Sequence, residues 1–157
     1  MKHIWAPWRI DYIEMDKPEF CFFCDKSKGT DDTTNYILFR GKYNFIILNS
    51  FPYNPGHLLI SPFRHIANFH NFSDSERNEH FKIVNHSTKC LSKVFNPGGF
   101  NIGLNLSRLA GAGVLDHIHT HVVPRWLGDT NFMPVLSETK VIPQSLADTY
   151  QRLKECF

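Results

Sequence analysis

The chain has 157 residues, of which 42% are hydrophobic and 20% charged, as in an ordinary globular protein. Its net charge of +2 gives no indication of nucleic-acid binding, and no apolar run is long enough to span a membrane. The N-terminus lacks the apolar core and cleavage site of a signal peptide, so we expect a cytoplasmic protein. The length predicts a single domain over residues 1–157.

The N-terminal segment, residues 1–20, is rich in aromatic side chains such as Trp5 and Trp8. We expect an arm whose aromatic residues pack on the body of the protein, or alternatively a patch near a ligand or a partner subunit. The next residues, Cys21-Phe22-Phe23-Cys24, have the spacing at which two thiolates bind one metal ion. No second pair of this kind follows, so histidines would have to complete a four-ligand site. No βαβ pattern surrounds the pair, which disfavours a redox motif.

Short apolar runs bounded by turn residues predict strands at 36–39, 45–48 and 57–62, after a polar loop over 26–35. The loop at 49–56 is rich in proline and asparagine, and we expect it to have a defined shape.

A long helix is predicted from 73 to about 95. It begins with Ser73-Asp74-Ser75-Glu76, which resembles a capping box, and it ends before Asn96-Pro97-Gly98-Gly99. Helical spacing predicts one apolar face, formed by Phe81, Val84, Thr88, Leu91 and Phe95.

In the last third, alternation predicts a strand at 100–106, a second strand follows at 117–123, and residues 127–140 have no regular pattern. A C-terminal helix is expected over 143–156, since Pro143 lies near its start. The order of elements predicts an α+β fold: an antiparallel five-stranded sheet, one long helix and a C-terminal helix.

The strand at 117–123 contains three of the nine histidines at alternate positions, His117, His119 and His121. Because alternate side chains of a strand point to the same face, the three imidazoles are expected to form one row. Directly upstream, Ala110-Gly111-Ala112-Gly113 predicts a flexible loop whose backbone N–H groups are able to approach an anion. A row of imidazoles beside such a loop suits phosphate chemistry.

A neutral imidazole attacks phosphorus and forms a covalent phospho-histidine intermediate, and a second histidine donates a proton to the leaving oxygen. The glycine-rich loop and Asn105 would stabilise the charge that develops. One alternative is a zinc hydrolase whose metal is held by the histidine row, although few carboxylates lie nearby to act as base. The other is an exposed strand without chemistry, which the tight clustering beside the loop disfavours.

The segment 117–123, in which three histidines alternate with other residues before two apolar ones, resembles the motif of the histidine triad (HIT) family. Two upstream segments are also similar to HIT proteins: Asn49 with Pro55-Gly56-His57, and Ser61-Pro62-Phe63-Arg64-His65-Ile66. The segments Trp5-Ala6-Pro7-Trp8-Arg9 and 126–135 resemble a branch similar to diadenosine tetraphosphate (Ap4A) phosphorylases. The resemblance then covers most of the chain.

The resemblance implies a single HIT-like domain, with 1–20 as an N-terminal arm and 126–157 as a C-terminal extension. It implies a homodimer whose sheets join across the interface. It also implies cleavage of a dinucleoside polyphosphate, with adenine as the expected base, at an α-phosphate through a nucleotidyl-histidine. Phosphate is the expected acceptor; the alternatives are a hydrolase that uses water and a nucleotide-binding module without turnover.

The resemblance also assigns roles to individual residues. His119 matches the nucleophile, and His121 matches a residue that contacts the phosphate and assists the leaving group. The expected substrate-binding residues are Asn49, His57, Asn105, Gly111, Ala112 and Gly113. Many bacterial-type members carry a structural zinc ion, and the matching ligands here are Cys21, Cys24, His65 and His117. No cofactor is expected at the reacting phosphate.

The sequence departs from the family pattern at three positions. Thr120 occupies a slot that is usually apolar, and Gly113 and Val114 stand where many members have Gln and Ser or Thr. Phosphate contacts are therefore expected from backbone N–H groups, or from Asn101 or Asn105. This difference favours the branch that resembles the phosphorylases.

Overall fold

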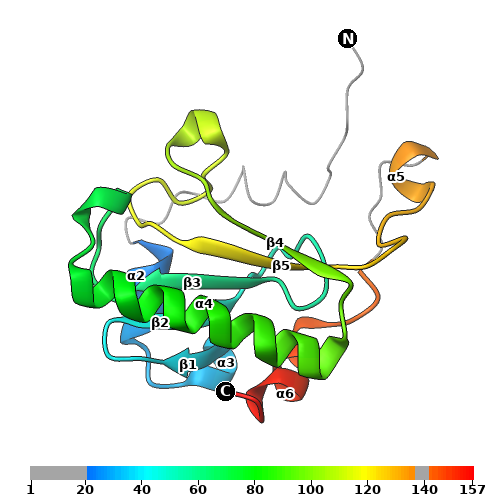
Figure 1. The fold of residues 1–157 in the computed structure, drawn as a ribbon, viewed down its shortest axis with the longest axis horizontal. Helices are drawn as coiled ribbons and strands as arrows, with labels where there is room; N and C mark the ends of the chain where they lie inside the picture. Colours follow the sequence, from blue (N-terminus) through cyan, green and yellow to red (C-terminus); the bar gives the residue numbers. More distant parts are fainter. Residues whose placement is uncertain (1–20, 137–141) are drawn as a thin grey trace.

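The computed structural model describes residues 21–136 and 142–157 (Figure 1). The predicted N-terminal arm, with Trp5 and Trp8, lies outside the described residues, and so do residues 137–141.

The centre of the structure is one antiparallel sheet of five strands in the order β1-β2-β3-β5-β4, which confirms the predicted α+β class. The strands are β1 (Ile37–Arg40), β2 (Asn44–Leu48), β3 (Leu58–Pro62), β4 (Gly99–Leu104) and β5 (Thr120–Arg125). Strand β4 pairs only with β5 among the described strands, so β4 forms one edge of the sheet.

The long helix α4 (Asp74–Phe95) lies across one face of the sheet, and α6 (Leu146–Lys154) packs beside it (Figure 1). This side holds the larger core, which includes Leu48, Leu58, Leu91 and Leu153. On the opposite face, α2 (Phe22–Lys28) adds Phe23 to a second core. The remaining helices are short: α3 (Asp32–Asn35), η1 (Phe69–Asn71), η2 (Arg108–Ala110) and α5 (Met133–Leu136).

Helix α4 begins as predicted, because the Ser73 hydroxyl and the Glu76 carboxylate form a complete capping box. It ends at Phe95, where Asn96 adopts a left-handed conformation. The predicted apolar face was wrong in part, since Phe81 is exposed. The buried stripe is offset by one residue and includes His80, Ile83, Val84, Ser87 and Leu91. The apolar periodicity did not reveal this stripe, because His80 and Ser87 are polar residues that nevertheless face the sheet.

Two other expectations require correction. The segment 26–35, predicted to be a loop, contains the end of α2 and all of α3. The C-terminal helix is shorter than predicted, because Ser145 caps it by accepting a hydrogen bond from the backbone N–H of Asp148.

The histidine segment also differs from the predicted strand, because β5 begins only at Thr120. Strand β3 ends at Pro62, and the backbone N–H of Ile118 instead donates to the carbonyl oxygen of Ile66, 2.7 Å away. His117 and His119 therefore precede the regular ladder. The alternation of side chains nevertheless continues through both, since Ile118 is buried in a core with Ile66 and Phe72.

Candidate active site and metal centre

The three histidines lie in sequence along the face of the sheet opposite α4. His117 and His119 both contact the ring of Phe23, at centroid distances of 5.2 and 4.8 Å. The rings of His119 and His121 are 5.1 Å apart. All three imidazoles are wholly or largely buried, and their different hydrogen-bond partners give them different chemical states.

His119 is held by a hydrogen bond between its Nδ1 and the carbonyl oxygen of His117, at 2.9 Å. A carbonyl oxygen only accepts, so Nδ1 carries the proton and Nε2 carries the lone pair. Burial lowers the pKa of His119, which keeps the ring neutral at neutral pH. A neutral ring with an available Nε2 lone pair has the form that a nucleophilic histidine requires.

His121 receives its orientation from His57. The backbone N–H of Tyr53 donates to Nδ1 of His57, so in the neutral ring the proton lies on Nε2. That Nε2 is 2.9 Å from Nδ1 of His121, to which it donates. The proton of neutral His121 is therefore on its Nε2, a buried atom without a hydrogen-bond partner within the described structure. Asn49 extends this chain, because its amide nitrogen lies 3.2 Å from Nδ1 of His57.

Burial and, to a smaller extent, the neighbouring His119 together lower the pKa of His121 to about 4. The free protein thus presents a neutral imidazole with an unpaired N–H, which is a hydrogen-bond donor without positive charge. An anionic ligand beside this N–H would favour the protonated ring and so raise the pKa. His121 is therefore arranged to donate a hydrogen bond or a proton when an anion binds.

The ring of His117 is directed toward the cysteine pair, Cys21 and Cys24. Its Nε2 donates to the carbonyl oxygen of Pro62 at 2.8 Å, which leaves the Nδ1 lone pair directed at the thiols. That Nδ1 lies 3.2 Å from Sγ of Cys21 and 3.5 Å from Sγ of Cys24, and Nδ1 of His65 lies 3.4 Å from Sγ of Cys24. All four ligand atoms are within 4.8 Å of one another.

The three distances between imidazole Nδ1 and cysteine Sγ fit a metal ion, since ligand bonds of about 2.0–2.3 Å in a tetrahedron put neighbouring ligand atoms roughly 3.3–3.8 Å apart. The set of two thiols and two imidazoles is typical of closed structural sites. Within residues 21–136 and 142–157, this is the only group of three or more His, Cys, Asp or Glu side chains arranged to hold a metal. The alternative in which the three histidines share one ion is not supported, because both ring nitrogens of His117 face other groups, Nε2 the carbonyl oxygen of Pro62 and Nδ1 the two thiols.

The loop before the histidines presents fewer backbone donors than the sequence indicated. The N–H of Gly111 donates to Arg108 and that of Ala112 to Ser107, both within the loop. Val114, at a position where many HIT proteins have a hydroxyl, packs with the core around Phe23. Of the three predicted donors, Gly113 alone has an N–H for which the described part of the chain provides no backbone acceptor.

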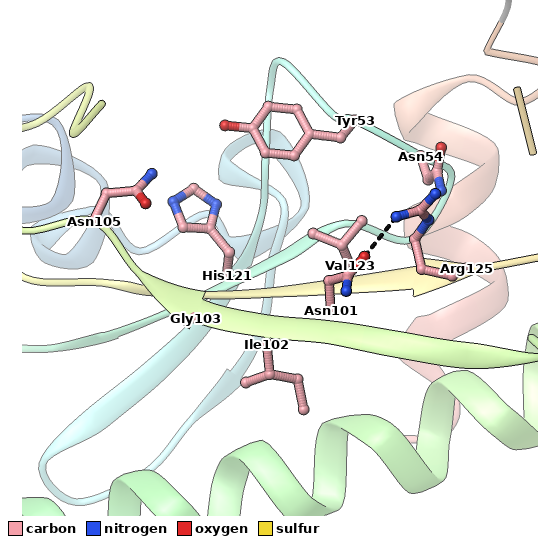
Figure 2. A pocket seen from close by; sticks show the side chains of 9 residues that line it. All are labelled: Tyr53, Asn54, Asn101, Ile102, Gly103, Asn105, His121, Val123 and Arg125. Carbon is pink, nitrogen blue, oxygen red and sulfur yellow. Dashed lines mark hydrogen bonds between the residues drawn. The ribbon is translucent and has the colours of Figure 1, made fainter. Parts of the chain in front are cut away.

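A pocket of about 360 Å³ opens beside His121 (Figure 2). Asn105, which the sequence analysis selected, lines this pocket, and so does Asn101. The pocket also has lining residues that the sequence analysis missed: Tyr53, Asn54, Ile102, Gly103, Val123 and Arg125. Register explains part of this set, because Asn101 pairs with Val123 and Gly103 with His121. Only the assignment of β4 as the partner of β5 would have revealed it from the sequence.

The structure thus defines an α+β protein in which a neutral imidazole with an available Nε2 lone pair lies next to a second imidazole with an unpaired N–H, and in which two cysteines and two histidines form a separate cluster that could hold a metal ion. The chain belongs to the HIT domain family, whose model matches residues 31–126. This agrees with the resemblance carried by the histidine motif.

Individual relatives extend the match beyond the domain. An AP-4-A phosphorylase of Mycobacterium tuberculosis is 34% identical over 98% of this chain and 83% of its own length. An asymmetrical bis(5'-nucleosyl)-tetraphosphatase of Schizosaccharomyces pombe is 31% identical over 59% of this chain and 50% of its own. The crystal structure of a Zn-bound histidine triad family protein from Mycobacterium smegmatis superposes with a TM-score of 0.68 at 20% identity, covering 87% of this chain and 91% of that one. At that identity the structural match supports the fold alone.

Proposed function

We propose that the protein is an enzyme that cleaves a dinucleoside polyphosphate such as Ap4A at an α-phosphate. The observation that carries this proposal is the complementary state of two adjacent imidazoles, His119 with a lone pair on Nε2 and His121 with an unpaired N–H. Similarity to an AP-4-A phosphorylase over nearly the whole chain supports the substrate class.

In the first step, Nε2 of His119 attacks the α-phosphorus, and the bond from that phosphorus to the bridging oxygen breaks. For Ap4A this gives adenylyl-His119 and ATP, whose oxygen receives a hydrogen bond or proton from Nε2 of His121. In the second step an oxygen of inorganic phosphate attacks the same phosphorus, which releases His119 and forms ADP. If water attacks instead, the product is AMP, as expected for a hydrolase.

The proposed substrate contacts follow from the sequence and are compatible with the geometry. Asn105 lines the pocket beside His121, and Gly113 has a backbone N–H available for the α-phosphate. Asn49 bonds to His57, so its role is on the histidine side of the site rather than the ribose side. The two remaining loop positions, Gly111 and Ala112, would shape the loop that carries Gly113.

Two further features belong to this proposal. We propose that Cys21, Cys24, His65 and His117 bind a structural zinc ion, which would fix the strand end next to His119 without entering the reaction. A homodimer is proposed through the edge strand β4, whose central residues are exposed and whose outer side pairs with no other strand among the described residues.

Product analysis with Ap4A, with and without phosphate, tests the proposal. ADP and ATP formed only when phosphate is present would identify a phosphorylase, whereas AMP and ATP in its absence would identify a hydrolase. His119→Asn should abolish both reactions. Full turnover by that variant, or adenine nucleotide binding by the wild type without any cleavage, would refute the proposed function.

A further inference from the structure

The pocket beside His121 extends away from the nucleophile. Figure 2 shows His121 and Asn105 near one end of the pocket and Arg125 with Asn54 near the other, with Tyr53 above. Gly103 and Val123 form the floor between these ends. Because residue 103 has no side chain and Val123 is apolar, the middle of the pocket offers room but little polarity.

The side chains of β5 alternate between the two faces of the sheet, and this determines which of them border the pocket. His119, His121, Val123 and Arg125 occupy alternate positions, so their side chains leave the same face. Arg125 is four residue steps along the strand from His121, which corresponds to about 13 Å. A ligand whose reacting atom is at His119 must therefore extend well past His121 before it reaches Arg125.

Among the described residues that line the pocket, Arg125 is the only one with a charged side chain, and its guanidinium has N–H groups available for a further ligand. Its guanidinium donates to both carboxylate oxygens of Asp129 and, from Nη1, to Oδ1 of Asn101 at 2.6 Å. These contacts use three of the five N–H groups, and the described structure gives the other two no partner. The side chain is 48% exposed, whereas that of Asp129 is 9% exposed.

Asp129 holds the arginine without competing for the pocket. Its carboxylate also accepts from the amide of Asn54 and from the backbone N–H of Trp126. The guanidinium next to it keeps the pKa of Asp129 well below its usual range, so this carboxylate stays ionised and bound to its partners. The fork of Arg125 is thus fixed in orientation while its outer N–H groups face solvent and pocket, an arrangement suited to phosphate oxygens.

We propose that this pocket receives the polyphosphate of the leaving nucleotide, that Arg125 binds its distal phosphates, and that the pocket thereby selects substrates by polyphosphate length. The inference rests on the proposed function in one respect, that the nucleophile is His119. In-line displacement requires the leaving group to lie opposite the nucleophile. His121, the donor to that group, borders the pocket. The opposite direction along the row leads to His117 and the cysteines.

Two substrates with the same adenylyl group test this inference. Ap4A has distal phosphates on its leaving group, and adenosine 5′-phosphoramidate, whose leaving group is ammonia, has none. Arg125→Gln should lower kcat/KM for Ap4A by about ten- to thirty-fold more than for the phosphoramidate, the effect expected when a charge-assisted hydrogen bond is lost. Arg125→Lys keeps the positive charge but not the planar guanidinium. It should give a smaller change in the ratio of kcat/KM for Ap4A to kcat/KM for the phosphoramidate.

Arg77→Gln is the matched control, because Arg77 is also ion-paired, with Asp74 at 2.9 Å, but lies on α4. It should leave the ratio unchanged. Thermal unfolding of each variant identifies any loss of fold. If Arg125→Gln does not fold, the kcat/KM values of Arg125→Lys for the two substrates provide the test. Equal effects of the Arg125 substitutions on both substrates would overturn the inference.

Binding of inorganic tripolyphosphate, measured by calorimetry, keeps the inference separate from the proposed function. If the wild type cleaves neither substrate, the proposed function fails, yet the pocket is still tested. Arg125→Gln should then weaken tripolyphosphate binding at least ten-fold relative to wild type and Arg77→Gln. Equal affinity in all three proteins would overturn the role of Arg125.

Discussion

The buried imidazole of His80 provides a quantitative prediction about the core behind the active site. Its Nδ1 donates to Oδ1 of Asn44 at 2.9 Å, and its Nε2 accepts from the hydroxyl of Thr120 at 2.7 Å. His80→Leu removes both bonds and leaves two buried polar atoms without these partners. Since each such atom costs about 1–3 kcal/mol, the free energy of unfolding at pH 7.5 should fall by roughly 2–6 kcal/mol.

The effect of this substitution should depend on pH. Burial lowers the pKa of His80 from 6.5 to about 4 in the folded state. Between these values the unfolded chain binds more protons than the folded one, so the contribution of His80 to stability falls as pH decreases. A pKa of 6.5 unfolded and about 4 folded gives a loss of about 2 kcal/mol between pH 7.5 and 5.0. The His80→Leu variant has no imidazole to titrate. The difference in free energy of unfolding between wild type and this variant should therefore be about 2 kcal/mol smaller at pH 5.0 than at pH 7.5.

Urea unfolding of both proteins at pH 7.5 and 5.0, followed by fluorescence, measures these differences. His86→Leu is the matched control: His86 is on the same helix but exposed, and replacing it should cost under about 1 kcal/mol at pH 7.5. A stability difference between wild type and His80→Leu that is the same at both pH values would refute the reasoning. It would mean that His80 is not held neutral by burial.

Two other substitutions test the capping box and the metal centre. The carboxylate of Glu76 accepts a hydrogen bond from Arg64 at 2.8 Å, which helps to lower the pKa of Glu76 from 4.5 to about 2. Glu76→Gln should therefore reduce the free energy of unfolding at pH 7 by about 1–2 kcal/mol; this figure is reduced because the side chain of Arg64 is exposed. This contribution is present above pH 4.5 and is lost as the pH falls toward about 2; urea unfolding that shows no loss at pH 7 would contradict it. For the metal centre, the purified protein should contain about one zinc ion per chain by mass spectrometry, and Cys21→Ser should lose it. Cys156→Ser, at a cysteine outside the cluster, should retain the zinc, and a wild-type chain without zinc after supplementation would exclude the site.

The regular elements could be predicted from sequence because local patterns determine them. The capping residues of α4 and the short apolar runs predicted the α+β class and the approximate positions of the five strands, α4 and α6, whereas the short helices such as α2 and α3 were missed. The pattern of burial on α4 was harder to predict. His80 faces the core because Asn44 and Thr120, from two strands far away in the chain, supply its partners. No local pattern contains that information.

The histidine motif and the cysteine pair could be recognised because each is a local sequence pattern. The residues that lie next to them in space could not be predicted in this way. The neighbours of His117 and His121 depend on the turns that bring Cys21 and His57 alongside them. Arg125 was missed because its position in the pocket depends on the pairing of β5 with β4 and on the loop that carries Asp129. Long-range pairing therefore limits the prediction of this site more than residue chemistry does.

Thr120 connects these observations, since it lies between His119 and His121 at a position where the resemblance to the HIT motif implied an apolar residue. Its side chain is buried on the face toward α4, where its hydroxyl donates to His80. An apolar residue at that position would leave Nε2 of His80 without its donor in the core, which is unfavourable. The pair also joins the start of β5 directly to helix α4. The structure thus compensates for this difference, and the bond between Thr120 and His80 couples the backbone that carries His119 and His121 to α4.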